Sequence, residues 1–152
     1  MNITKVKPGD AEAVRKIKPS LSNKTIKERL EKQAEGKVDF LLLEDNGQPV
    51  SFVLLKWEGK STHPEYPDME DLYTREEFRG KGYGTLLIKE CEERARKKFF
   101  GKIGLAVNPN ENPKAKVLYE RLGYKHDGEK TYLDATYNGV EDWVIDLEKD
   151  LK

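Results

Sequence analysis

The sequence predicts a mixed α/β domain in which helices cover both faces of a β-sheet, and three observations carry this prediction. Two apolar runs at 38–44 and 50–57 flank Asn46-Gly47, the dipeptide that most strongly indicates a hairpin. A strand-like segment at 69–74 leads through a glycine-rich turn into an amphipathic helical pattern at 84–100. The predicted order of elements, β-α-α-β-β-β-α-β-α-β-β, is typical of a mixed sheet with helices on both sides.

The first part of the chain is predicted to form one strand and two helices. Residues 2–6 alternate in polarity, as a half-exposed strand does. Asp10 is expected to be the N-cap of a helix that Pro19 ends. Ser22 begins a second helical pattern, and Gly36 closes it.

The middle of the chain contains the predicted hairpin, a loop and a long helix. The segment 59–67 is polar and contains two prolines, so we expect a loop there. In the helix that follows the glycine-rich turn, one face carries Leu87, Ile88, Cys91, Ala95 and Phe99. Cys91 is therefore expected to be a small core residue and not a nucleophile.

The last part of the chain is predicted to form a strand, a helix and a second hairpin. Residues 102–107 read as a short buried strand. Asn112-Pro113 combines an N-cap residue with proline at the first helical position, and Gly123 ends the predicted helix. Asn138-Gly139 then indicates a hairpin turn into a last strand in which Trp143, Ile145 and Leu147 alternate.

Length and composition predict one soluble domain over residues 1–152. Lys plus Arg and Asp plus Glu both number 28, so the formal net charge is zero. This balance argues against nucleic acid or an anionic membrane as the partner. We expect a cytoplasmic protein, because Cys91 is the only cysteine and we find no membrane span and no signal-peptide core at the N-terminus.

The segment Arg79–Gly84 has three glycines at alternate positions, at the start of a predicted helix. Without side chains, the backbone N–H groups of such a turn can approach a ligand closely at the positive end of the helix dipole, where phosphates bind. Two nucleotide-binding loops do not fit. The chain lacks the pattern that a triphosphate-binding loop requires, a glycine followed after four residues by Gly-Lys-Ser/Thr. The dinucleotide-binding pattern would need glycine at the position of Thr85.

Two motifs together resemble those of the GNAT superfamily of acyl-CoA-dependent N-acetyltransferases. The family pattern Arg/Gln-x-x-Gly-x-Gly/Ala is read here at Arg79–Gly84. The second pattern, Asn-x-x-Ala followed by Leu-Tyr-x-x-Leu-Gly-Phe/Tyr, is read at Asn112–Tyr124. The resemblance implies a mixed, mostly antiparallel sheet that splays apart, with acetyl-CoA as co-substrate.

The resemblance also implies which residues hold acetyl-CoA. The backbone N–H groups of the glycine turn would bind the pyrophosphate, and the strand that ends at Thr74 would pair with the pantetheine arm. A backbone N–H of Leu72 or Tyr73 would polarise the thioester carbonyl. Asn112 either caps its helix or contacts the pantetheine arm. The full implied set is Leu72, Tyr73, Thr74, Arg79, Gly80, Lys81, Gly82, Tyr83, Gly84, Thr85, Asn112, Ala115 and Tyr119.

Tyr119 matches the position of the family's general acid, which protonates the departing thiolate. The acceptor ammonium must also lose a proton, and the candidate bases are Asp68, Glu70 and Asp71, of which Glu70 is preferred. Strand alternation would put Asp68 and Glu70 on the face that Leu72 and Thr74 share, with Asp71 opposite. His63 and His126 are expected to be exposed, and without a His/Cys cluster we expect no metal site.

The function implied by the resemblance is transfer of an acetyl group from acetyl-CoA to a primary amine, by direct attack in a ternary complex. Two alternatives stay open: a non-catalytic acyl-CoA-binding sensor or scaffold of the same fold, and a nucleotide-binding regulatory module. Acceptor specificity is expected to come from 10–35, the loop 59–67 and the final hairpin. The sequence does not identify the acceptor, and both a monomer and a homodimer are compatible with it.

Overall fold

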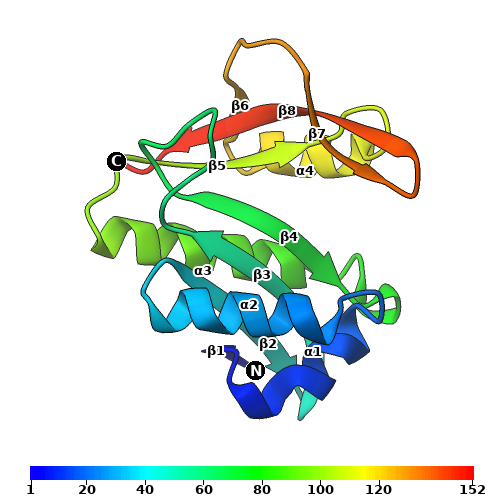
Figure 1. Ribbon diagram of the computed structural model, residues 1–152. Coiled ribbons are helices and arrows are strands. Elements are labelled where there is room, and N and C mark those ends of the chain that lie inside the picture. Colours follow the sequence, from blue (N-terminus) through cyan, green and yellow to red (C-terminus); the bar gives the residue numbers. More distant parts are fainter.

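A computed structural model describes residues 1–152 and confirms the mixed α/β architecture (Figure 1). The predicted helices and long strands are present in the predicted order, and a two-residue strand, β6, and two short 3₁₀ turns, η1 and η2, are added to them. The elements are β1 (Asn2–Lys5), η1 (Pro8–Asp10), α1 (Ala11–Ile17), α2 (Asn23–Ala34), β2 (Val38–Asp45), β3 (Gln48–Lys56), β4 (Asp68–Thr74), η2 (Glu76–Phe78), α3 (Tyr83–Lys97), β5 (Lys102–Val107), α4 (Pro113–Arg121), β6 (Lys125–His126), β7 (Tyr132–Tyr137) and β8 (Val140–Asp150).

The strands form one eight-stranded sheet in the order β1-β2-β3-β4-β5-β8-β6, and β7 pairs with β8. Every pairing is antiparallel except that of β4 with β5, which is parallel. Asn46 and Gly47 form the predicted turn between β2 and β3, both with positive φ. The sheet is therefore mixed and mostly antiparallel, as expected.

Two hydrophobic clusters lie on opposite faces of the sheet. The larger cluster packs α3 residues such as Leu87, Ile88 and Cys91 against β2, β3 and β5. The smaller one packs Val14 of α1 and Ile26 of α2 against β2 and β3. Figure 1 shows this arrangement, with α1 and α2 in front of the strands and α3 behind them. Cys91 is completely buried, which confirms that it is a core residue.

The two N-terminal helices begin differently from each other. Ser22 caps α2 as predicted, because its side chain accepts the Thr25 N–H. Asp10 precedes α1, but its carboxylate does not cap that helix. The Asp10 Oδ2 atom instead accepts the Lys7 N–H at 2.8 Å and closes the 3₁₀ turn η1. Asp10 therefore occupies the predicted N-cap position of α1, but the capping hydrogen bond is absent because its carboxylate closes the extra turn. None of the helices is both long enough and apolar enough to cross a membrane.

The sheet opens between β4 and β5. These strands pair only at Asp68 with Gly104 and at Met69 with Leu105. Beyond that point they diverge, as the two arrows do from left to right in Figure 1. The remainder of β4 therefore has an unpaired edge on this side, and such an edge can accept an extended ligand as an added strand.

A β-bulge in β4 changes which side chains face each side of the sheet. Leu54 opposes Glu70 and Phe52 opposes Tyr73, so that two residues, Asp71 and Leu72, lie opposite one. Asp71 has a φ of 52°. Leu72 consequently packs against the α3 cluster, while Glu70 opposes Leu54, a residue of the other cluster. The predicted shared face of Asp68, Glu70, Leu72 and Thr74 was wrong, because uninterrupted alternation does not allow for a bulge.

Candidate active site

The glycine turn leaves a row of backbone N–H groups without partners at the start of α3. Gly80 and Gly82 have φ values of 76° and 86°, a conformation that strongly favours glycine. Gly82 is the N-cap of α3. None of the backbone N–H groups from Gly80 to Thr85 donates to a backbone carbonyl. The turn therefore presents unpaired donors at a helix N-terminus, which suits an anion such as a phosphate.

Side chains around this turn are held by protein partners. The Arg79 Nε atom donates to the Thr74 carbonyl at 2.8 Å, and its guanidinium lies over the Tyr73 ring. The Tyr83 hydroxyl donates to Asp45. Lys81 is exposed and forms no ion pair, although its ammonium lies 5.7 Å from the centre of the Phe78 ring. Arg79 and Tyr83 thus shape the turn, while the Lys81 ammonium remains available to a ligand.

A cavity of about 880 Å³ lies where β4 and β5 separate. Its walls come from the connection between α1 and α2, from β4, from the end of β5, from α4 and from the β7–β8 hairpin. Leu72, Asn112, Ala115 and Tyr119 all line it, so the structure brings the strand that precedes the glycine turn together with three residues of the second motif. The glycine turn itself does not line the cavity. The cavity also borders all three regions that were expected to determine the acceptor.

Asn112 and Tyr119 are placed on the cavity by helix α4. The Asn112 side chain makes no capping hydrogen bond to α4, so the capping role considered for it is absent. Tyr119 is partly buried against the larger cluster, and burial raises the pKa of its phenol. A phenol with a raised pKa remains protonated at neutral pH, as a proton donor must.

The three carboxylates of β4 have different surroundings. Asp71 is held by two cations, with the Lys18 Nζ atom at 2.7 Å and the Arg29 Nη2 atom at 2.9 Å. Glu70 is half-exposed and pairs with Lys56 at 3.1 Å. Asp68 is only 1% exposed, and neither of its carboxylate oxygens has a hydrogen-bond partner. All three line the cavity, but only Asp68 is both buried and free of hydrogen bonds.

The ionisation of Asp68 is controlled mainly by burial. Burial raises the pKa of its carboxyl group to about 7, although the nearby Lys60 opposes the shift. The Lys60 Nζ atom lies 3.3 Å from Oδ1, within ion-pair range but without hydrogen-bond geometry. Asp68 can therefore exchange a proton near neutral pH, which is the property required of a general base.

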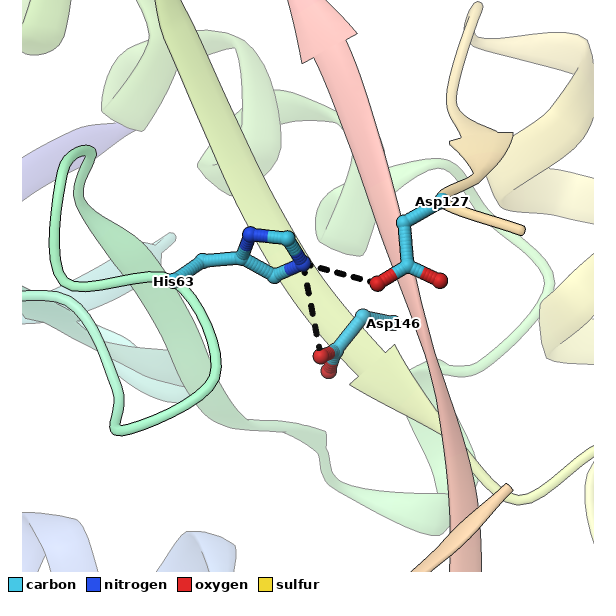
Figure 2. Close-up of side chains that lie close together, drawn as sticks. All are labelled: His63, Asp127 and Asp146. Atoms are coloured by element: carbon cyan, nitrogen blue, oxygen red, sulfur yellow. Dashed lines mark hydrogen bonds and ion pairs between the residues drawn. The ribbon is translucent and has the colours of Figure 1, made fainter. Parts of the chain in front are cut away.

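His63 is the centre of a polar cluster beside this cavity (Figure 2). Its Nε2 atom lies 2.7 Å from Asp127 and 3.7 Å from Asp146, and its Nδ1 atom lies 3.0 Å from Glu65. The side chain is 17% exposed, so the expectation that His63 is solvent-exposed was wrong. The same expectation for His126 is confirmed, since that residue is exposed.

The ligand atoms of His63, Asp127 and Asp146 lie within 4.8 Å of one another and could hold a metal ion. Sequence analysis missed this group because its members are far apart in the chain. Each already has partners within the protein: Asp146 accepts from Lys60, Thr62 and Tyr132, and Asp127 faces His63. The cluster therefore explains how the loop 59–67 is attached to β8 and how Lys60 is held next to Asp68.

A family model described as the acetyltransferase (GNAT) family matches residues 11–124. The chain belongs to this family. An uncharacterized N-acetyltransferase of Methanocaldococcus jannaschii is 34% identical over 88 residues, which are 57% of this chain and 38% of the relative. The thialysine N-epsilon-acetyltransferase of Sus scrofa is 36% identical over 72 residues, 47% of this chain and 39% of the relative. The matches thus span well under half the length of these relatives.

Solved structures show the same fold over almost the entire chain. A ribosomal-protein-alanine N-acetyltransferase from Brucella melitensis superposes with a TM-score of 0.80 at 16% identity, over 99% of each chain. A variant of the spermidine N-acetyltransferase from Vibrio cholerae superposes with a TM-score of 0.78 at 20% identity, over 99% of this chain and 95% of that one. The fold is therefore shared by acetyltransferases whose named acceptors differ, and it does not identify the acceptor here.

Proposed function

We propose that this GNAT domain transfers an acetyl group from acetyl-CoA to a primary amine, by direct attack of the amine within a ternary complex. One observation carries the proposal. The free N–H groups of the glycine turn stand at one end of β4, and the unpaired edge of β4 leads to a cavity that both Tyr119 and Asp68 line. A donor that is anchored by its phosphates can thus reach an acid and a base in one cavity.

The donor would lie along β4. The pyrophosphate would accept hydrogen bonds from the N–H groups between Gly80 and Thr85, where the dipole of α3 also favours negative charge. The amides of the pantetheine arm would pair with the free edge of β4. The Leu72 or Tyr73 N–H would then stabilise the oxyanion that forms on the thioester carbonyl.

Asp68 is the base that the structure supports best. An alkyl ammonium has a pKa near 10.4, so only about one molecule in a thousand is nucleophilic at neutral pH. A carboxylate whose pKa is about 7 can accept that proton, directly or through a water molecule. Glu70, the residue that sequence analysis preferred, lines the same cavity but is half-exposed and paired with Lys56.

Tyr119 would complete the reaction. The ammonium first gives one proton to Asp68, which later releases it to solvent, and the neutral amine nitrogen then bonds to the carbonyl carbon. The nitrogen loses its second proton to solvent as the amide forms. When the carbon–sulfur bond breaks, the phenol of Tyr119 donates its proton to the thiolate. The products are the acetylated amine and CoA, and the phenol regains a proton from solvent.

Thermal unfolding in the presence of acetyl-CoA, CoA or ATP tests the donor site. At one hundred times its dissociation constant, a ligand adds about 2.7 kcal/mol to the free energy of unfolding. We expect acetyl-CoA and CoA to raise the melting temperature. Stabilisation by ATP alone would contradict the proposal and favour a nucleotide-binding module.

Replacement of Tyr119 by phenylalanine tests catalysis separately from binding. We expect Tyr119→Phe to lower kcat by about 100-fold, the lower range for loss of a proton donor, while acetyl-CoA binding is nearly unchanged. Release of free thiol with a panel of amines measures kcat. Acetyl-CoA binding without any thiol release by the unaltered protein would instead support a sensor or scaffold.

A further inference from the structure

The β7–β8 hairpin presents two carboxylates, Asp134 and Asp142, to the cavity. Neither forms an ion pair with a cation of the protein. The Asp142 Oδ1 atom accepts one hydrogen bond from the neutral Asn108 amide at 2.8 Å. Two acidic groups on one wall thus lack the ion pairs that the other carboxylates of the cavity have.

A bulge in the hairpin directs both groups to the same cavity. Leu133 opposes Trp143 and Ala135 opposes Asp142, which leaves Asp134 as an extra residue between the two pairs. Because Ala135 is paired with Asp142, regular alternation would direct the adjacent Asp134 to the opposite face of the sheet. Asp134, although exposed, nevertheless lines the cavity together with Asp142. Partial burial raises the pKa of Asp134, the charge of Lys60 opposes this shift, and the carboxylates of Asp142 and Glu70 add to it.

The cations of the cavity are committed elsewhere. Lys18 and Arg29 hold Asp71, and Lys60 pairs with Asp146 and lies beside Asp68. On the β4 wall, the carboxylate of Asp68 is buried, and neither of its oxygens forms a hydrogen bond. The cavity therefore has acidic groups on two separate walls: Asp68 on the β4 wall, which lacks hydrogen bonds, and Asp134 and Asp142 on the hairpin wall, which lack ion pairs.

We propose that the acceptor is a linear amine with a second cationic group, as in an alkane diamine, and that Asp134 and Asp142 bind this second cation. The proposal rests on the acetyltransferase function proposed above. The reacting amine lies near Asp68 on the β4 wall, and the remote ammonium lies on the hairpin. An acceptor with only one amine leaves the hairpin pair without a counter-charge, and an acceptor with a carboxylate at that end is repelled by it.

One feature of the cavity favours a different acceptor. The Arg29 Nη1 atom is buried without a hydrogen-bond partner, and Arg29 lines the same cavity. It could bind the carboxylate of an amino-acid acceptor. The Nη2 atom of the same guanidinium is already bound to Asp71, and that ion pair lowers its capacity to bind a second anion. The hairpin carboxylates have no such competitor, so the diamine is the better supported acceptor.

Three acceptors with the same four-carbon chain separate these possibilities: 1,4-diaminobutane, butylamine and 4-aminobutyrate. We expect kcat/KM for the diamine to exceed that for butylamine by about tenfold or more, the value of one charge-assisted hydrogen bond. We expect 4-aminobutyrate to be the poorest acceptor. Equal rates with the diamine and butylamine, or a preference for 4-aminobutyrate, would overturn the inference.

Charge-neutral variants of the hairpin assign the preference to specific residues. The preference is measured as the ratio of kcat/KM for the diamine to kcat/KM for butylamine. The double variant Asp134→Asn, Asp142→Asn is expected to lose most of this preference. Glu141→Gln removes a charge from the same hairpin at a residue outside the cavity, and is expected to leave the ratio unchanged. A ratio that persists in the double variant would contradict the proposal.

The controls distinguish failure of this inference from failure of the proposed function. Each variant is first tested for stabilisation by acetyl-CoA, which reports on folding and on the donor site. If the unaltered protein binds no acetyl-CoA and acetylates no amine, the proposed function itself is wrong. If it acetylates amines without a preference for the diamine, only the second-cation site is wrong.

Discussion

Asp68 and Asp146 are both buried acids that contact the ammonium of Lys60, yet their surroundings are opposite. Asp146 accepts hydrogen bonds from Lys60, Thr62 and Tyr132, and Asp68 accepts none. Burial raises the pKa of Asp68 to about 7. Burial also opposes ionisation of Asp146, but the three hydrogen bonds outweigh it and lower the pKa of that residue.

The comparison shows how one lysine can serve two purposes. A carboxylate with several donors is fixed in its ionised form and stabilises the fold. A carboxylate that is buried next to the same cation without donors can gain or lose a proton near neutral pH. We therefore propose that Asp146 stabilises the fold and that Asp68 takes part in the chemistry, and the predictions below test that division.

The largest effect is expected for Asp68→Asn. Because an amide cannot accept the ammonium proton, we expect kcat at neutral pH to fall by about 100-fold or more. The free energy of unfolding should not decrease, since no hydrogen bond to the carboxylate is lost. Thiol-release kinetics and urea unfolding measure the two quantities. A normal kcat in Asp68→Asn, together with an inactive Glu70→Gln, would transfer the role of base to Glu70.

The pH profile gives an independent measurement of the same assignment. A base acts only when ionised, so kcat of the unaltered protein should rise with pH and level off above about 7. This inflection should disappear in Asp68→Asn. An inflection that is retained in the variant would show that another group titrates.

Asp146→Asn should affect stability more than chemistry. The substitution removes the carboxylate that pairs with the half-buried Lys60 ammonium and accepts hydrogen bonds from Thr62 and Tyr132. Because Asp68 stays beside Lys60, we expect a loss of about 2 kcal/mol, below the cost of a buried charge left without any partner. Urea unfolding measures this loss. Asp150→Asn, at an exposed position on the same strand without an ion pair, should change stability by less than about 0.5 kcal/mol. Equal effects of the two variants would contradict the structural role of Asp146.

Stability should depend on pH in opposite ways for the two acids. The folded pKa of Asp68 lies above its unfolded value, so its contribution to stability is present below about pH 4 and is lost as pH rises through 7. The pKa of Asp146 in the folded protein is lowered. Its contribution to stability is therefore present above the pKa of an unfolded aspartate and is lost as pH falls through the folded pKa. Relative to the unaltered protein, Asp68→Asn should gain stability between pH 5 and pH 8, and Asp146→Asn should not.

Local sequence signals predicted the parts of the site that depend on local structure. The turn at Gly80 and Gly82 requires positive φ, and the helix start at Pro113 follows from proline geometry. The bulge at Asp71 could not be predicted in this way, because it depends on the register of β4 against β3. The different surroundings of Asp68 and Asp146 depend on contacts between the loop 59–67 and β8, which the sequence pattern does not contain.

The smallest effect is expected for His63→Gln, which tests whether the cluster around Asp146 is purely structural. Burial lowers the pKa of His63, but hydrogen bonds to Asp127 and Glu65 outweigh burial and raise it overall. Its contribution is therefore fully present below about pH 6.5, the unfolded value, and is lost as pH rises through the folded pKa. We expect a loss of no more than about 1 kcal/mol at pH 5.5 and a smaller loss at pH 8.5. His126→Gln, at an exposed histidine, should cost less at pH 5.5. Addition of zinc provides the counter-test: stabilisation of the unaltered protein, and not of His63→Gln, would show that the cluster binds metal.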